Sequence, residues 1–239
     1  MNFAVIGDIH SNIFALESVL EDIKGRDVDF IICTGDMVGY APFPNEVIDL
    51  IRNSNVLSIQ GNYDKAIGNS DIVCGCDYTD ERQLEMAGLS VLFTNMVVTD
   101  KNRTYLKELP TELNLKVGEL QILVVHGSHR INNEYLFENS VAVDEVTKEI
   151  KEDILICGHT HKPYYKVING KHVINSGSAG KPKHGNPNAT YVHVIVENEI
   201  VKVDIVEVKY DFEKVAQAIE ENEILPNDFA DMIRKGKSI

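Results

Sequence analysis

Five short apolar runs constrain the fold more than any other feature of this sequence. Each is four to six residues long and rich in Val, Ile and Leu: Phe3–Ile6, Asp29–Cys33, Val56–Ile59, Leu120–Val125 and Ile154–Cys157. Continuous apolar runs of this length are typical of strands that are covered on both faces. We therefore expect central strands of one or more sheets.

The segments between the first three runs have helical spacing. Apolar residues recur every three or four positions in 13–23, directly after Ser11-Asn12 as an N-cap. The same spacing returns in 44–52, which begins with a proline. The first sixty residues therefore predict alternating strands and helices, the βαβ arrangement of α/β proteins.

The remaining sequence changes character twice. Residues 63–110 have no strand-like run, and helical spacing in 80–96 and 100–109 predicts a helical insertion. From Leu113 onward strands prevail, and Asn169-Gly170 is typical of a type I′ hairpin turn between two of them. A second hairpin is expected across Glu197-Asn198-Glu199, and two helices are expected at 211–221 and 228–234.

No repeat, low-complexity tract or linker separates these parts. We therefore expect residues 1–239 to form a single α/β domain with a helical cap insertion at about 63–110. Its architecture would be a four-layer α/β/β/α sandwich, in which two mixed sheets are flanked by helices.

The net charge of the chain limits the classes of partner that it is expected to bind. Of 239 residues, 37 are acidic and 23 are basic, which gives a formal net charge of −14. That charge repels phosphate backbones and argues against a nucleic-acid polymer as partner. No apolar run approaches the roughly 20 residues of a bilayer span, and no leader-like segment follows Met1. We expect a cytoplasmic protein that binds no membrane.

The four cysteines do not suggest a disulfide framework. Cys33 and Cys157 end apolar runs and are expected to be reduced thiols in the core. Cys74 and Cys76 form a thiol pair in a loop of the insertion; with no adjacent histidine they make a poor zinc site, and their role is left open.

Potential metal ligands gather in five loops that follow predicted strands. The loops are Gly7-Asp8-Ile9-His10, Gly35-Asp36, Gly61-Asn62-Tyr63-Asp64, His126-Gly127 and Gly158-His159-Thr160-His161. Ligands of open α/β sheets bind outside the carboxyl ends of the strands, so the loops should converge there. A single Asp or His is more often a helix cap or a satisfied polar residue; the prediction rests on all five loops together. Their side chains suit Mn²⁺, Fe²⁺, Zn²⁺, Ni²⁺ or Co²⁺ and exceed the needs of one ion.

In order and spacing, these loops resemble the signature of the calcineurin-like metallophosphoesterases, from Phe3 to about Gly180. Gly35–Tyr40, Asn133–Tyr135 and Asn175–Gly180 resemble the small bacterial and archaeal phosphodiesterase branch of that superfamily. The resemblance implies a β-sandwich flanked by helices and a phosphoester hydrolase with two divalent transition-metal ions. Mn²⁺ is the first expectation for both ions, with Fe²⁺ or Fe³⁺, Ni²⁺, Co²⁺ and Zn²⁺ as alternatives.

The resemblance also implies a role for each ligand. One metal would be held by Asp8, His10, Asp36 and His161, and the other by Asp36, Asn62, His126 and His159. Asp36 would then bridge two cations roughly 3.5–4 Å apart, and a hydroxide clamped between them would attack the phosphorus.

One position departs from the family pattern. Many members have G-N-H-D, in which the histidine contacts the phosphate and is thought to protonate the leaving oxygen; this chain has Tyr63 there. Tyr63 could still bind the phosphate, but its reference pKa near 10 makes it a weak acid catalyst. His129 is the alternative acid, or equally a partner of a ligand histidine. Asp64 is expected either to orient an imidazole such as that of His10 or to cap a helix.

The substrate is expected to be small. The insertion would narrow access, and the negative charge disfavours polymers, so nucleotide-derived diesters and dinucleoside polyphosphates fit better than DNA or RNA. Candidate contacts to an anionic substrate are Arg130, Lys181, Lys183 and His184, each of which could equally be a solvated side chain. Tyr40, Phe43 or Tyr135 could stack on a base, or could simply pack.

Two other function classes stay open at this stage. A protein serine/threonine phosphatase would share the metal ligands but usually needs the missing histidine and an open groove. A non-catalytic interaction module on the same fold, as in the retromer subunit of the superfamily, would not need a complete ligand set. A homo-oligomer is also left open.

Overall fold

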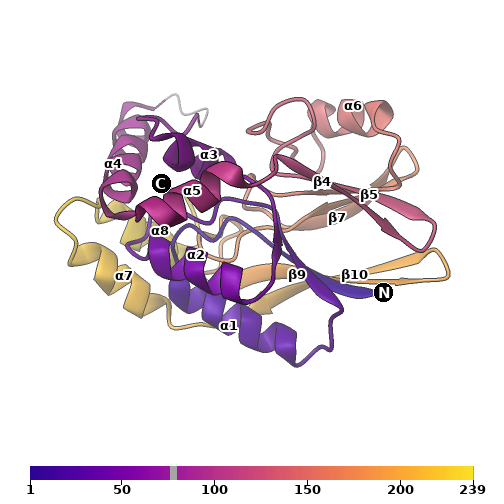
Figure 1. Cartoon of the computed structure of the whole chain (residues 1–239), viewed down its shortest axis with the longest axis horizontal. Coiled ribbons are helices and arrows are strands. Elements are labelled where there is room, and N and C mark those ends of the chain that lie inside the picture. Colours follow the sequence, from indigo (N-terminus) through magenta and orange to yellow (C-terminus); the bar gives the residue numbers. More distant parts are fainter. Residues whose placement is uncertain (76–79, 239) are drawn as a thin grey trace.

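Two five-stranded sheets form the centre of the computed structural model, which describes residues 1–75 and 80–238 (Figure 1). The strands of the first sheet lie in the order β10 (Ile200–Val208), β9 (Ala189–Glu197), β1 (Asn2–Ile6), β2 (Phe30–Cys33) and β3 (Leu57–Ser58). The second sheet has the order β4 (Glu112–Val117), β5 (Leu120–Val125), β6 (Ile154–Cys157), β8 (Lys171–Asn175) and β7 (Tyr164–Ile168).

Both sheets mix parallel and antiparallel pairs. In the first sheet β1, β2 and β3 are parallel, whereas β9 runs antiparallel to β1 and β10. In the second sheet β5, β6 and β8 are parallel, and β4 and β7 are antiparallel edge strands. Five of the six parallel strands, β1, β2, β3, β5 and β6, are those that the continuous apolar runs predict, because such strands are buried on both faces. The sixth, β8, was expected only as a strand of the Asn169-Gly170 hairpin.

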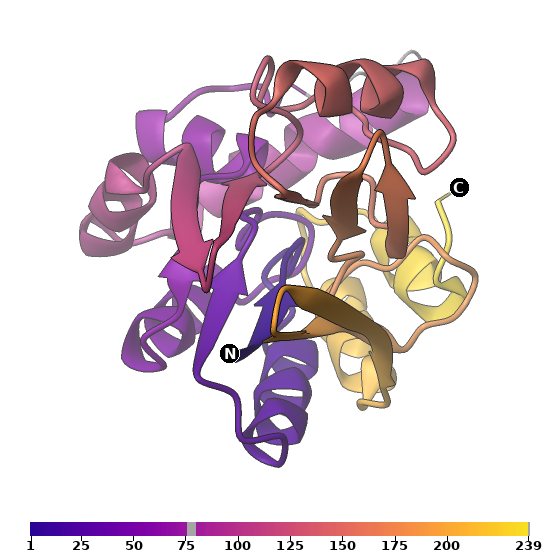
Figure 2. The same ribbon diagram turned by 90° about the vertical axis from the view of Figure 1, so that its right-hand side faces the viewer.

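The alternation of side chains along the strands builds three apolar layers. Phe3 and Val5 of β1 pack against Ile122 and Val124 of β5, so the two sheets face each other. On the outer side of the first sheet, Ala4 and Ile6 pack with residues of the helices α1, α2, α7 and α8. On the outer side of the second sheet, residues of β5 and β6 pack with α6. The four-layer α/β/β/α sandwich is confirmed (Figure 2).

Eight helices surround the sheets in the described part of the chain. They are α1 (Ile13–Lys24), α2 (Pro44–Asn53), α3 (Asn62–Asn69), α4 (Glu81–Val97), α5 (Asp100–Glu108), α6 (Val141–Glu149), α7 (Phe212–Glu220) and α8 (Asp228–Lys235). Helices α3, α4 and α5 follow one another between β3 and β4, where the helical insertion was expected. None of the helices described is both long and apolar enough to cross a bilayer.

Two elements were not predicted from the sequence, and one turn differs. Helices α3 and α6 were not indicated by periodicity, because three of the apolar residues of α6 are adjacent in 141–143 and α3 begins inside the predicted ligand loop 61–64. In the last hairpin Glu197 pairs directly with Ile200, so the turn has two residues rather than three. Asn198 and Glu199 both have positive φ, as Asn169 and Gly170 have in the predicted type I′ turn.

The cysteines behave as expected where the structure describes them. Cys33 and Cys157 are free, buried thiols in the apolar layers, and Cys74 is also buried. The second thiol of the loop pair, Cys76, lies outside the described residues.

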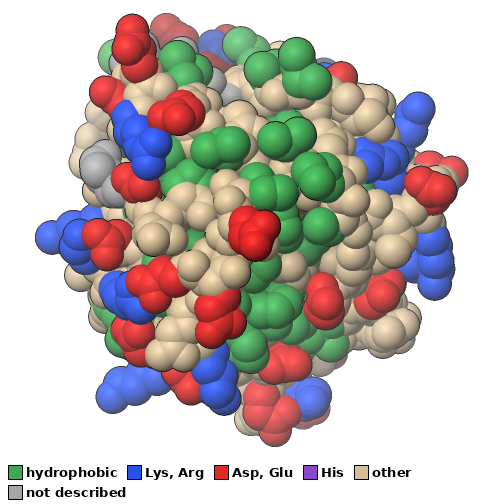
Figure 3. Space-filling model, turned by 90° about the vertical axis from the view of Figure 1, so that its left-hand side faces the viewer, with side chains coloured by type: hydrophobic (Ala, Val, Ile, Leu, Met, Phe, Trp, Pro, Cys, Tyr) green, Lys and Arg blue, Asp and Glu red, His purple; other side chains and the backbone are tan. Residues whose placement is uncertain are grey.

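The face on the side of α4 is rich in apolar side chains. Hydrophobic groups gather across the middle of this face, while charged groups lie mostly around them (Figure 3). On α4 itself, Leu84, Leu92 and Met96 are exposed by 50, 50 and 64%, although Met86 and Val91 of the same helix are buried in the core. Helix α4 is therefore apolar on its outer side as well as on its packed side.

Asn12 links three parts of the fold. Its Oδ1 accepts the Ala15 N–H at 3.2 Å as the predicted N-cap of α1, and its Nδ2 donates to the Gly180 carbonyl at 2.9 Å and the Tyr210 hydroxyl at 3.1 Å. The side chain is completely buried, so removing it leaves buried polar groups without partners.

We predict that Asn12→Ala lowers the free energy of unfolding by about 2–3 kcal/mol, measured by urea denaturation. The matched control is Asp80→Ala, which removes the cap of α4, an exposed hydrogen bond to the Gln83 N–H at 3.0 Å. We expect Asp80→Ala to lower the free energy of unfolding by about 1 kcal/mol. Equal losses in the two variants would contradict the linking role of Asn12.

Candidate active site

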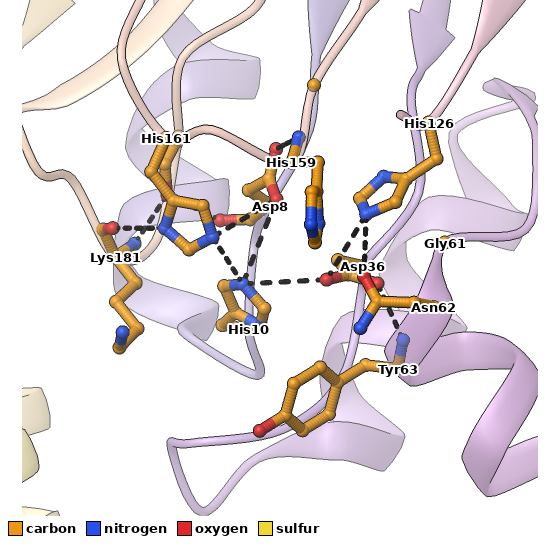
Figure 4. A network of polar contacts seen from close by, with 12 residues as sticks. Asp8, His10, Asp36, Gly61, Asn62, Tyr63, His126, His159, His161 and Lys181 are labelled. Atoms are coloured by element: carbon orange, nitrogen blue, oxygen red, sulfur yellow. Dashed lines mark hydrogen bonds and ion pairs between the residues drawn. The ribbon is translucent and has the colours of Figure 1, made fainter. Parts of the chain in front are cut away.

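The five predicted loops converge at the carboxyl ends of the parallel strands (Figure 4). Asp8 and His10 follow β1, Asp36 follows β2, and Asn62 opens α3 directly after β3. His126 follows β5, and His159 and His161 follow β6, so both sheets contribute side chains. All seven residues are at most 5% exposed. The structure thus brings together every residue that the sequence nominates as a metal ligand.

These side chains form two adjoining clusters. Asp8, His10 and His161 make one group and Asp36, His126 and His159 the other, and within each group the ligand atoms lie within 4.8 Å of one another. The Asp36 carboxylate lies between the groups, with its Oδ2 3.8 Å from His10 Nε2 and 3.5 Å from His126 Nε2. Asn62 joins the second group through its Oδ1, 2.9 Å from His126 Nε2.

Backbone carbonyls fix the tautomers of three histidines. The Nδ1 atoms of His10, His126 and His161 lie 3.1, 2.8 and 2.6 Å from the carbonyl oxygens of Val38, Thr34 and Lys181. A carbonyl can only accept, so each Nδ1 carries the hydrogen and donates it. In the neutral imidazoles the lone pair is then on Nε2, which faces the site.

These lone pairs face other acceptors. His10 Nε2 and His161 Nε2 are 3.1 Å apart. His126 Nε2 faces the Asn62 Oδ1. The Asn62 amide is oriented by a 2.9 Å hydrogen bond from its Nδ2 to the Cys74 carbonyl. His159 is buried with both ring nitrogens lacking a hydrogen-bond partner among the described residues. Acceptors that converge in a dry site require a cation or a proton between them, so these residues fit a metal centre.

The charges of the site agree with this interpretation. Burial lowers the pKa of His10 to about 3 and lowers those of His159 and His161, which keeps these imidazoles neutral and able to bind a metal. Burial would also lower the pKa of His126, but the carboxylates of Asp36 and Asp8 outweigh it and raise that pKa to about 9. Without a metal, a proton on His126 therefore takes the place of the cation.

Five of the candidate ligands have a left-handed backbone. The φ angles are 49° for Asp8, 49° for His10, 55° for Asp36, 63° for His159 and 58° for His161. Residues other than glycine rarely adopt this backbone region. Those that do cluster at functional sites, where the surrounding structure holds them. Here the loops after β1 and β2 hold each other: the N–H of Asp8 donates to the Gly35 carbonyl at 3.0 Å, and that of His10 to the Asp36 carbonyl at 3.0 Å.

Asp64 holds the loop that contains Asp36 through hydrogen bonds to the backbone. Its carboxylate accepts three backbone N–H groups, those of Asp36 at 2.7 Å, Met37 at 2.9 Å and Gly61 at 3.0 Å. Burial and the neighbouring Asp36 charge raise the pKa of Asp64, while the N–H groups of Gly61 and Met37 act in the opposite direction. Of the two roles that the sequence allows for Asp64, these contacts agree with the helix cap at the start of α3. The Asp64 carboxylate binds backbone N–H groups in these contacts and not an imidazole.

Tyr63 is fully buried beside the first cluster. Its backbone N–H donates to Asp36 Oδ1 at 2.8 Å, and its ring lies 5.5 Å from that of His10 and 4.9 Å from that of Tyr40, between ring centroids. Tyr40 in turn packs at 4.7 Å against His10. Both tyrosines therefore pack around a candidate ligand.

Two other predicted residues are engaged elsewhere. His129 has its Nε2 3.1 Å from Glu149 Oε2. Arg130 pairs with Glu134 and lies 3.2 Å from both Glu145 and Glu149. Three carboxylates thus surround the guanidinium, which leaves little of its charge for a substrate.

The loop after β8 brings two lysines to the site. Lys181 is buried, and its Nζ lies 4.1 Å from the centre of the Tyr40 ring. Burial is the main cause of the lowered pKa of His10 and His161, and the charge of Lys181 lowers both further. Lys183 is half-buried and acts on the same His161 and on His159. His184 lies apart from them, with its Nε2 3.8 Å from Glu207 Oε1.

Sequence reasoning did not find the backbone groups that orient the histidines. The carbonyls of Thr34, Val38 and Lys181 carry no signal in the sequence, because every residue has a carbonyl. Of the aromatic candidates, Tyr135 lies 4.2 Å from the His159 ring and Tyr40 lies near His10, whereas Phe43 packs at 5.4 Å on Phe14.

The family follows from a comparison with known families. The model of the calcineurin-like phosphoesterase superfamily domain matches residues 1–199. This chain belongs to that superfamily. It is therefore a metal-dependent phosphoesterase, a hydrolase that acts on phosphoric ester bonds, and the resemblance found in the sequence is confirmed.

Individual proteins agree with this assignment. An uncharacterized protein of Methanocaldococcus jannaschii is 33% identical over 238 residues, which covers 92% of this chain and 93% of that protein. A hypothetical protein from Pyrococcus horikoshii OT3 has the same fold with a TM-score of 0.85 and 26% identity, covering 100% of this chain and 99% of that one. A metallophosphoesterase from Sphaerobacter thermophilus follows with a TM-score of 0.77, 26% identity and 99% coverage of both chains.

Gly61 gives a direct test of how closely the loops pack. A Cβ at this position would lie 2.2 Å from Asp36 Oδ1 and 2.3 Å from the Asp36 nitrogen. We predict that Gly61→Ala lowers the free energy of unfolding by about 1–3 kcal/mol in thermal or urea unfolding. Gly88→Ala is the control, because a Cβ there meets nothing within 4 Å in the middle of α4. The control should be neutral or stabilising; a harmless Gly61→Ala would contradict the described packing.

Proposed function

We propose that this protein hydrolyses small phosphoesters with two divalent transition-metal ions held by the two clusters. The observation that carries the proposal is the Asp36 carboxylate, which lies between two buried groups whose imidazole lone pairs face inward. A borderline-hard set of carboxylate and imidazole ligands suits Mn²⁺ as the first choice, with Fe²⁺ or Fe³⁺, Ni²⁺, Co²⁺ and Zn²⁺ as alternatives.

The ligand assignment of the sequence is kept in this proposal. Asp8, His10, Asp36 and His161 would hold one ion, and Asp36, Asn62, His126 and His159 the other. When bound, such ions would polarise the phosphoryl oxygens and lower the pKa of the attacking water. The carbonyls behind His10, His126 and His161 keep the Nε2 atoms available for them, and Asp64 keeps Asp36 in place between the clusters.

The substrate phosphate would be met by positive charge from the loop after β8. Lys181 and Lys183 are close enough to act on the imidazoles of the first cluster, so we propose them as contacts for phosphoryl oxygens. The substrate-binding roles of Arg130 and His184 stay predictions, which their glutamate partners do not favour.

The general acid is the part of the mechanism with two candidates. Tyr63 lies beside His10 in the buried site, but its phenol is a weak acid. His129 is a better acid by type and points to Glu149. Esters with good leaving groups need little acid catalysis, so they should be the better substrates of this enzyme.

The alternative functions differ in what the site would need. A protein serine/threonine phosphatase must admit a folded or extended phosphopeptide, whereas here all seven candidate ligands are at most 5% exposed. A non-catalytic module has no use for seven ligand side chains of coordinating type, five of which are held at unfavourable φ. A phosphopeptide assay and a metal analysis test the two alternatives. Cytoplasmic location, a lack of nucleic-acid and membrane partners, and a homo-oligomer stay predictions.

Asp36→Asn tests the proposed bridge. The variant keeps the shape of the side chain but removes the charge that two ions would share, so we expect it to lose at least one ion per chain and more than 100-fold of the activity with Mn²⁺. Metal content by mass spectrometry and hydrolysis of bis-p-nitrophenyl phosphate and p-nitrophenyl phosphate are the measurements. Asp204→Asn, at an exposed position of β10, is the matched control. Full metal content and activity in Asp36→Asn would exclude the bridge.

His129→Ala separates the two candidate acids. If His129 donates the proton, the variant should lose about 10²-fold or more on alkyl esters and little on p-nitrophenyl esters, because only the alkoxide needs the proton. The readout is the ratio of kcat on the two kinds of ester. An unchanged ratio would remove His129 from the mechanism and leave its contact with Glu149 as a surface ion pair.

A further inference from the structure

A pocket of about 550 Å³ lies between the helical insertion and the loop that follows β5. Leu84, Ala87 and Gly88 of α4 line one side, and Ile131, Asn133 and Tyr135 line the other. A hydrogen bond from Asn133 Nδ2 to the Gly75 carbonyl joins the two sides. Pockets of this volume are typical of sites for small organic ligands.

This pocket adjoins the second cluster of the active site. Tyr135, in its wall, lies 4.2 Å from the ring of His159, measured between ring centroids. Cys74, also in its wall, accepts the hydrogen bond of 2.9 Å from the Asn62 amide. Two candidate ligands of the second cluster, His159 and Asn62, thus contact residues of the pocket wall.

The charges around the active site are unevenly distributed. None of the described residues that line the pocket is a Lys, Arg or His, and the one charged residue, Glu134, is already paired with Arg130 and Ser128. The lysines near the site, Lys181 and Lys183, come from the loop after β8 and do not line the pocket. A second phosphate placed here would meet no cation among the described lining residues, whereas an apolar ring would bury its surface against Leu84 and Ile131.

We propose that this pocket binds an uncharged, ring-bearing organic group of the substrate, such as an aryl group or a nucleoside, next to the phosphate that is hydrolysed. The inference rests on the proposed function and narrows it: esters with such a group are preferred over dinucleoside polyphosphates and over esters whose second group is anionic.

The first test compares diesters that differ only in the group for the pocket. Methyl, phenyl and 4-carboxyphenyl p-nitrophenyl phosphate release the same p-nitrophenolate, so their rates compare the second group alone. With Mn²⁺ we expect kcat/KM for the phenyl ester to exceed that of the methyl ester about tenfold, and the 4-carboxyphenyl ester to lose most of this gain. Equal values for the three esters would overturn the inference.

Gly88 allows the pocket to be filled without disturbing the fold. Gly88 lines the pocket, and a Cβ there would meet no atom within 4 Å, so we use Gly88→Leu to place a larger side chain at the pocket wall. We expect Gly88→Leu to abolish the preference for phenyl over methyl, while the control Gly88→Ala keeps it. A preference that persists in Gly88→Leu contradicts the proposed position of the ring.

Ile131→Lys tests the role of charge at the opposite wall. Ile131 is 57% exposed, so a lysine can be accommodated there and would bring a cation to the pocket. We expect the 4-carboxyphenyl ester to gain about tenfold in kcat/KM relative to the phenyl ester. An unchanged ratio would mean that the second group of the ester does not reach this wall.

A binding measurement separates this inference from the proposed hydrolysis. Phenylphosphonate and methylphosphonate share a headgroup that cannot be hydrolysed, and calorimetry should show tighter binding of the phenyl compound to the wild type and to Gly88→Ala but not to Gly88→Leu. If this pattern appears without turnover of any ester, the pocket is confirmed and the hydrolysis fails. If all esters are hydrolysed but neither phosphonate is distinguished, the pocket inference fails alone.

Discussion

The structure depends on the convergence of buried acceptor groups between the two sheets. Two carboxylates and four imidazoles, all nearly inaccessible to water, form two groups in which the ligand atoms lie within 4.8 Å of one another. Such an arrangement is unfavourable in a dry interior unless positive charge lies among the acceptors. The Asp36 and Asp8 carboxylates raise the pKa of His126 against the effect of burial, which agrees with a site that favours positive charge.

The surrounding fold keeps that arrangement in place. The loops after β1 and β2 exchange backbone hydrogen bonds and hold Asp8, His10 and Asp36 in left-handed conformations. Asp64 ties the Asp36 loop to the start of α3 through three N–H groups. Because both sheets contribute side chains, the sandwich must be complete before the site exists, and the site in turn links the two sheets.

Much of the fold could be predicted because its strands have unambiguous patterns. Continuous apolar runs gave five of the six parallel strands, the hairpin turn at Asn169-Gly170 gave β8, and helical spacing gave six of the helices, including the N-cap Asn12. Helices α3 and α6 were missed because α3 begins inside a predicted ligand loop and because three of the apolar residues of α6 are adjacent rather than spaced by three or four. The residues of the two clusters could be named since each follows a strand, and carboxyl ends of parallel strands meet at one edge.

The sequence by itself determined the fold class, the family and the seven side chains that converge. Only the tertiary structure decided how these side chains face one another, that Asp64 holds backbone amides, and that Arg130 is surrounded by carboxylates. It also decided that an apolar pocket adjoins His159 and Asn62. The reason is physical: local patterns fix strands and loops, whereas charge pairing and pocket walls arise between residues that are distant in the chain.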